Sequence, residues 1–200
     1  MKKAFFILSL GSLFLIQICV ALCHPHVFVD AYLLFVFDDR GLCGIRERWV
    51  FDEMFSQNLL YDFDTDNDGR LNHDDVSQLR DIFYENTEDY NYFNNISING
   101  REYYIERLED FSISIEDGRI VYEFFVLCSL PVGPNEERNV KISLFDETIY
   151  TDLLIADYSV DMQQKPDSFS VDMRYDVLDE VVTPLGSVVP DSLVITFRKK

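Results

Sequence analysis

The sequence predicts an α+β fold that is mainly β: an antiparallel sheet or sandwich that carries an inserted EF-hand-like helix–loop–helix. Three observations lead to this prediction. Short segments with alternating apolar and polar residues recur along most of the chain, and turn residues separate them. One stretch, at about residues 52–86, instead repeats its apolar residues at helical spacing around an acidic loop.

Residues 1–23 predict a secretory signal peptide. Lys2 and Lys3 form a short basic head before the apolar run from Ala4 to Val20. This run is nearly long enough to span a bilayer, so a retained anchor is the alternative, but polar residues dilute it. Cleavage would leave residues 24–200 as a single, mainly β domain in the periplasm or outside the cell.

Charge restricts the partners of the protein. The chain has 36 Asp and Glu residues against 17 Lys and Arg, a formal net charge of −19. This charge excludes nucleic acid and anionic lipid surfaces as partners and is compatible with cations. We expect membrane association only if the signal is retained or if a cut before Cys23 leaves a lipoprotein, and Leu22 fits such a cut poorly.

The folded part begins with a predicted β-hairpin. Apolar residues alternate with polar ones from His26 to Asp38, which indicates a strand with one buried face. Turn residues follow from Asp38 to Gly41, and a second strand from Leu42 to Phe51 is expected to return antiparallel to the first.

The next elements are two helices, followed by further strands. Apolar residues recur at helical spacing from Phe55 to Phe63 and again from Val76 to Phe83. Alternation then returns, and Asn99-Gly100 is a strong hairpin turn. The expected later strands are Phe93–Ile98, Glu102–Ile105, Phe111–Ile115, Ile120–Leu127, Val140–Phe145, Thr148–Ile155, Phe169–Tyr175 and Leu193–Phe197, with surface loops at Pro131–Arg138 and Gln163–Ser168.

The acidic loop between the helices fits the spacing of an EF-hand calcium loop. Calcium takes six to eight oxygen ligands, so several carboxylates must converge on one point. The middle glycine of the motif, which permits the sharp turn, is Gly69. The predicted ligand positions are Asp64, Asp66, Asp68, Arg70 through its main-chain carbonyl, Asn72 and Asp75.

Asp75 departs from the usual motif, which ends on a bidentate glutamate. The shorter side chain predicts either single-oxygen coordination with weaker affinity or a tighter loop that tolerates magnesium. A single loop favours a structural clamp over a calcium sensor. The alternative is an Asp- and Asn-rich turn that binds no metal.

His24 and His26 form a second candidate metal site. If cleavage follows Cys23, the free amine and the imidazole of His24 can chelate a metal together with His26 or a carboxylate. Pro25 has no N–H to deprotonate, which excludes a square-planar site that uses the second and third main-chain amides. The open site of two or three nitrogens that is left suits nickel, cobalt, copper or zinc. The alternative is a polar start to the first strand without metal.

Cys43 and Cys128 are the two cysteines of the folded part. In an exported protein they are candidates for a disulfide that would stabilise the fold by about 4 kcal/mol. Two buried thiols on separate strands are the alternative.

The stretches His24 to Asp30 and Trp49 to Phe55, followed by the acidic loop, resemble a family of uncharacterised bacterial periplasmic proteins described as components of ABC-type transport systems. The resemblance covers most of His24 to Tyr158 and implies association with nickel, cobalt or zinc transport genes, with an inner-membrane metal transporter as partner. It implies no catalytic residues. Four acids in or near these stretches are candidate ligand carboxylates: Asp30, Asp52, Glu53 and Asp152.

These features predict a non-enzymatic periplasmic accessory protein that binds divalent metal and serves its transport, with structural calcium. Two alternatives come from other classes. A copper-dependent oxidase would hold copper through the N-terminal histidine, although a further histidine on a distant strand is missing. A structural or adhesive β-domain would have the calcium clamp and no transition-metal site.

Overall fold

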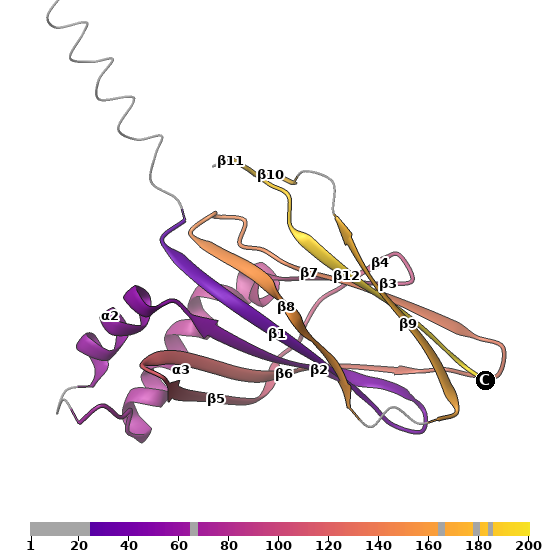
Figure 1. The fold of residues 1–200 in the computed structure, drawn as a ribbon, viewed down its shortest axis with the longest axis horizontal. Helices are drawn as coiled ribbons and strands as arrows, with labels where there is room; N and C mark the ends of the chain where they lie inside the picture. The colour runs from indigo at the N-terminus through magenta and orange to yellow at the C-terminus, as the bar shows by residue number, and fades with distance from the viewer. Residues whose placement is uncertain (1–24, 65–67, 164–166, 178–180, 184–185) are drawn as a thin grey trace, which may run out of the picture.

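The computed structural model describes residues 25–64, 68–163, 167–177, 181–183 and 186–200, and the predicted signal peptide lies outside them. The described strands form two five-stranded sheets and a two-stranded ribbon, with two helices at one end of the molecule (Figure 1). The predicted α+β, mainly β class is therefore confirmed.

The first sheet holds the N-terminal hairpin. Its strands, in spatial order, are β5 (Leu108–Glu116), β6 (Arg119–Pro131), β2 (Gly41–Phe51), β1 (Val27–Phe37) and β8 (Thr151–Gln163). β1 and β2 pair antiparallel, as the turn residues between them predict. β1 and β8, however, run parallel, with Val27 opposite Thr151. This parallel pair was not predicted from the sequence, because hairpin signals relate only strands that follow each other in the sequence.

The second sheet contains most of the C-terminal strands. Its order is β4 (Arg101–Tyr103), β3 (Asn94–Ile98), β7 (Glu137–Leu144), β12 (Asp191–Lys199) and β9 (Phe169–Val177). The ribbon of β10 (Val181–Thr183) and β11 (Gly186–Val188) was not predicted from the sequence. The predicted loop Pro131–Arg138 is shorter than expected, because β6 and β7 extend into it from both sides.

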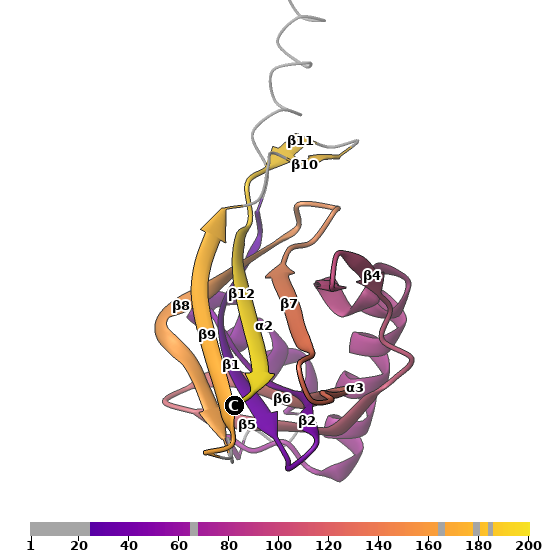
Figure 2. The ribbon, with the colours of Figure 1, turned by 90° about the vertical axis from the view of Figure 1, so that its right-hand side faces the viewer.

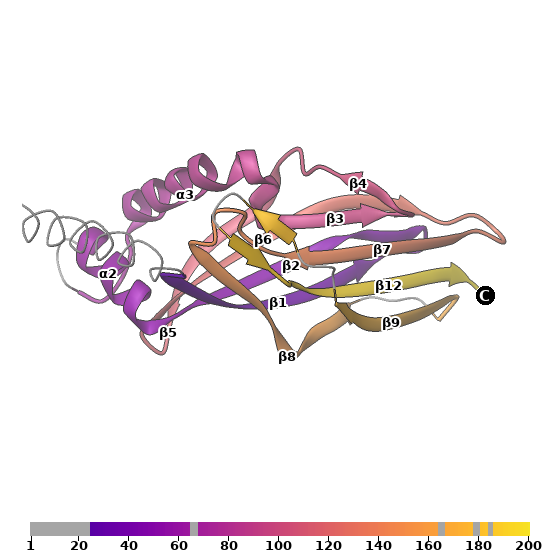
Figure 3. The same ribbon diagram turned by 90° about the horizontal axis from the view of Figure 1, so that it is seen from above.

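The two sheets pack face to face (Figures 2 and 3). Alternate residues of β1, from Val27 to Phe37, are buried, as the period-2 pattern requires for a strand with one core face. The Phe37 ring meets the Phe197 ring of β12 edge to face, with centroids 5.3 Å apart. One hydrophobic core therefore joins the inner faces of both sheets.

The rest of the inner face of the first sheet is covered by helices α2 (Glu53–Phe63) and α3 (His73–Thr87) and the short 3₁₀ segment η1 (Glu88–Phe93). Asp52 caps α2 by accepting the Phe55 N–H at 2.9 Å. The fully buried Ser56 hydroxyl of α2 accepts the Ile120 N–H of β6 at 2.9 Å, which fastens the helix to the sheet. Among the described helices, none has the length and apolar character needed to cross a bilayer.

Candidate functional site

The loop between α2 and α3 folds around the side chain of its first residue. Asp64 accepts the Asp68 N–H on Oδ1 at 3.2 Å and the Gly69 N–H on Oδ2 at 2.9 Å. Gly69 has φ of +76°, a left-handed conformation that only glycine adopts without strain. The sharp turn predicted at Gly69 is therefore present, and it aims main-chain N–H groups at the Asp64 carboxylate.

The loop ends in a capping box at the start of α3. The Asn72 side chain accepts the Asp74 and Asp75 N–H groups, and Asp75 accepts the Asn72 N–H at 2.9 Å. Asp64 and Asp75, the first and last residues of the loop, are 6% and 8% exposed. Buried carboxylates are rare unless paired or metal-bound, so these two are the strongest candidates for ligands.

The predicted ligand positions of the loop fit a hard cation, because the four described side chains at these positions carry oxygen donors: Asp64, Asp68, Asn72 and Asp75. Asp66, the remaining predicted side-chain ligand, lies outside the described residues. Within the described ranges, no three His, Cys, Asp or Glu side chains are grouped so that they could hold a metal. Metal binding by the loop stays a prediction.

The second candidate site is only partly described. His24 lies outside the described residues, whereas His26 directly precedes β1. The His26 N–H donates to the Tyr150 carbonyl at 2.9 Å, and the two rings lie 5.2 Å apart. Asp152 lies nearby in register, opposite Phe28 in the parallel β1–β8 pair.

The other three candidate carboxylates lie near the start of α2 and on β1. Asp52 accepts the Phe28 N–H at 2.9 Å in addition to capping α2. Asp30 forms an ion pair with Arg119 at 3.1 Å. Glu53 is an exposed residue in the first turn of α2, where its charge favours the helix dipole. Asp52 and Asp30 therefore have structural partners in the described residues.

The two cysteines lie on paired strands as free thiols, Cys43 half-buried on β2 and Cys128 buried on β6. Burial raises the pKa of both, that of Cys128 to about 12, and Asp38 adds to the rise at Cys43. Thiols held protonated are weak nucleophiles and weak metal ligands at neutral pH. A disulfide between them stays a prediction.

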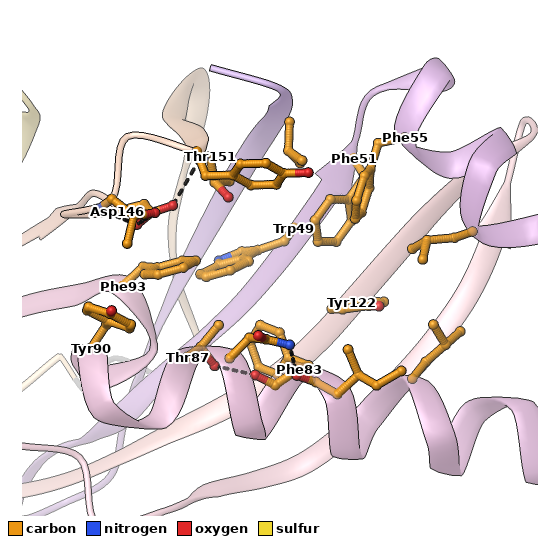
Figure 4. A pocket seen from close by; sticks show the side chains of 17 residues that line it. Trp49, Phe51, Phe55, Phe83, Thr87, Tyr90, Phe93, Tyr122, Asp146 and Thr151 are labelled. Atoms are coloured by element: carbon orange, nitrogen blue, oxygen red, sulfur yellow. Dashed lines mark hydrogen bonds between the residues drawn. The ribbon is translucent and has the colours of Figure 1, made fainter. Parts of the chain in front are cut away.

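A cavity of about 580 Å³ opens between α3, η1, α2 and the segment that joins β7 to β8. Figure 4 shows Trp49 and Phe93 side by side in this aromatic pocket, with Phe83 below them and Asp146 beyond Phe93. The sequence pattern did not predict the pocket, because its residues come from segments far apart in the chain. Trp49 lies in the motif from Trp49 to Phe55, yet the motif alone gives no indication of a cavity.

Next to Trp49, a lining residue of the aromatic pocket, lies a fully buried acid, Glu47 of β2. Its Oε2 accepts the Trp49 Nε1–H at 2.9 Å and is 3.5 Å from Asn94 Nδ2, while Oε1 has no hydrogen-bond partner. Burial raises the pKa of Glu47 to about 8, and the bonds from Trp49 and Asn94 oppose the rise. Glu47 is thus a neutral acid at neutral pH.

The comparisons with known proteins place the chain in a family. Residues 9–181 match the model of the family described as "Protein of unknown function (DUF1007)". The chain belongs to this family. This DUF1007 protein is also similar to the "Uncharacterized 15.5 kDa protein in trpE 3'region" of Spirochaeta aurantia, with 23% identity over 96 residues, 48% of the chain and 67% of the relative.

The family match of this DUF1007 protein extends over the acidic loop, both helices and all five strands of the first sheet. The expected resemblance to an uncharacterised family is thereby supported. Neither the family nor the relative is described in terms of transport, the periplasm or a metal. These finer expectations are proposals.

Proposed function

We propose that this protein is an exported, non-enzymatic accessory protein that binds divalent cations, with Ca²⁺ in the loop from Asp64 to Asp75. The observation that supports it most is the pair of buried loop carboxylates, Asp64 and Asp75, at the two ends of a loop with oxygen donors. A cation bound by both carboxylates would offset the cost of burying them.

Calcium in this loop acts as a clamp between the helices. Asp64 is the residue that ends α2, and Asp75 is in the first turn of α3. One ion that binds both carboxylates ties the end of one helix to the start of the next. The net charge of −19 increases the local concentration of cations around the loop. Magnesium, which prefers six ligands, is the expected competitor because Asp75 is short.

Asp64→Ala is expected to abolish stabilisation by calcium. At free calcium about 100 times above the dissociation constant, binding to the native state adds about 2.7 kcal/mol to the free energy of unfolding. Urea unfolding with calcium and with EDTA measures this difference. The matched control is Asp62→Ala, which removes an exposed acid of α2 outside the loop and should retain the calcium effect.

The calcium site is contradicted if calcium does not stabilise the parent protein. If the parent protein unfolds at the same urea concentration in calcium and in EDTA, the loop binds no calcium. A magnesium titration in EGTA then shows whether the shorter Asp75 favours the smaller ion.

The second part of the proposed function is transition-metal binding by His24 and His26 for an inner-membrane transporter. His26 enters the first sheet where Asp152 of β8 faces the start of β1, so a carboxylate lies close in register. Two nitrogens of His24, the His26 ring and one carboxylate would form an open site for nickel, cobalt, zinc or copper.

Calorimetric titration of the correctly processed protein tests this site. The parent is expected to bind at least one of nickel, cobalt, zinc and copper more tightly than a variant with His24→Ala and His26→Ala. Equal binding by the two proteins contradicts the histidine site. Oxygen consumption by the copper-loaded protein with a reductant, compared with free copper, distinguishes the oxidase alternative.

A further inference from the structure

We propose that the aromatic pocket binds an organic cation with an apolar body, such as an amine or quaternary ammonium that carries an aromatic group. None of the described candidate metal ligands lines the pocket, although the ring of Tyr150, a lining residue, lies 5.2 Å from the ring of His26. Three properties of the pocket indicate an organic cation as the ligand: its volume, its aromatic ring faces and the position of one buried carboxylate.

The volume and the lining fit a small molecule. Ligand sites typically measure about 300–1,000 Å³ and combine apolar walls with a few polar groups. This cavity measures about 580 Å³. Buried Trp49, Phe83 and Tyr122 are among the lining residues, while Ile82 and Tyr90 at the rim are each 43% exposed. The cavity therefore has a buried aromatic interior and an entrance to solvent.

The charge of the lining selects a cation. None of the 17 described residues that line the pocket is Lys, Arg or His, and Asp146 is the one carboxylate among them. Asp146 is 3% exposed. An anion would therefore meet an uncompensated buried carboxylate, and an uncharged ligand would bury the same carboxylate without a counter-charge.

Asp146 is held in place with acceptor capacity left over. Its Oδ1 accepts the N–H and the hydroxyl of Thr148, each at 2.7 Å, and its Oδ2 accepts the Thr151 N–H at 3.0 Å. A carboxylate has about four lone-pair positions, so one position on Oδ2 is left for a ligand N–H or a cationic methyl group. The three bonds fix the carboxylate before any ligand arrives.

Aromatic faces complete the cation site. The Trp49 and Phe93 rings lie nearly parallel, at 3°, with centroids 6.4 Å apart, and the Tyr90 ring lies 6.2 Å from Phe93. Figure 4 places these rings on the side of the pocket that holds Asp146. Ring faces attract cations, and recognition of quaternary ammonium groups commonly uses several rings together. The rings of Phe51 and Phe55, on the side of the pocket away from Asp146 in Figure 4, are left for the apolar body.

The test compares two ligands of the same shape. Benzyltrimethylammonium is cationic, and neopentylbenzene has the same framework with carbon in place of nitrogen. Trp49 is the single tryptophan of the chain, so its fluorescence reports binding directly. The cation is expected to bind roughly tenfold more tightly than the neutral ligand. Equal affinity, tighter binding of neopentylbenzene, or no binding of either ligand overturns the proposal.

Charge variants test the same site independently. Asp146→Asn should remove the preference for the cation, whereas Glu147→Gln, an exposed neighbour outside the pocket lining, should retain it. Because Asp146 also orders its own segment, Ile82→Lys provides a second test at the rim. It should weaken binding of the cation roughly tenfold, and Gln78→Lys, with the same charge change on the exposed face of α3, should not. Cation binding that Asp146→Asn and Ile82→Lys both leave unchanged contradicts the assignment.

Discussion

The free energy of unfolding is expected to fall as the pH rises from about 5 to about 8, because the native state holds a proton on Glu47 that the unfolded chain releases. Burial raises the pKa of Glu47 from 4.5 to about 8. Between these two values the native state binds one more proton than the unfolded state, so stability decreases with pH. The Glu47 contribution is fully present below about pH 4.5 and lost above about pH 8.

The size of this effect follows from the difference between the two pKa values. Each unit corresponds to about 1.4 kcal/mol, so complete ionisation in the native state costs at most about 5 kcal/mol. Glu47→Gln keeps the size of the side chain and removes the titration. We expect this variant to match or exceed the stability of the parent at pH 8 and to lose the Glu47 part of the pH slope.

Urea unfolding at pH 5, 6, 7 and 8 measures the slope for each protein. Glu85→Gln, an exposed acid of α3, is the matched control and should unfold with the slope of the parent. The other carboxylates of this acidic chain also titrate, so the difference between parent and Glu47→Gln isolates the buried group. Identical slopes for these two proteins would show that Glu47 is already ionised in the native state.

Elements whose signals are local were predicted well. The alternation in β1, the turn from Asp38 to Gly41 and the helical spacing around the acidic loop depend on residues close in sequence, and the structure contains all three. The N–H groups of Asp68 and Gly69 donate to the Asp64 carboxylate at the sharp turn that was predicted at Gly69. The ribbon of β10 and β11 was missed because its strands are only three residues long, too short to show a period.

Features that arise from distant segments could not be predicted. The parallel pairing of β1 with β8 joins residues more than a hundred positions apart, and no local pattern encodes it. Glu47 appears in the sequence as one charged residue in a strand, where a solvent-facing position is the default. Glu47 lies on the core face of β2 with Ile45 and Trp49, and its hydrogen-bond partners, Trp49 and Asn94 of the second sheet, come together only in the folded protein.

Phe83→Ala is expected to destabilise the protein by about 3–5 kcal/mol, the usual cost of removing a buried aromatic side chain. Phe83 is 7% exposed, and its ring lies 5.2 to 5.8 Å from the rings of Trp49, Phe111, Tyr122 and Phe124. It is the buried aromatic side chain of α3, and it packs on the first sheet together with the half-buried Tyr84. Ile82→Ala, at the exposed neighbouring position, is the control and should cost well under 1 kcal/mol.

Phe83→Ala also tests whether calcium ties α2 to α3 or binds to the loop independently of how the helices pack. If calcium ties α2 to α3, then its binding requires an ordered first turn of α3, where Asn72 and Asp75 form the capping box. Phe83→Ala loosens α3 from the sheet, so part of the binding energy must reorder the helix, and the calcium affinity should fall. Calcium titrations of Phe83→Ala and Ile82→Ala measure this. An affinity equal to that of the parent, despite the lost stability, would mean that the loop binds calcium independently of helix packing.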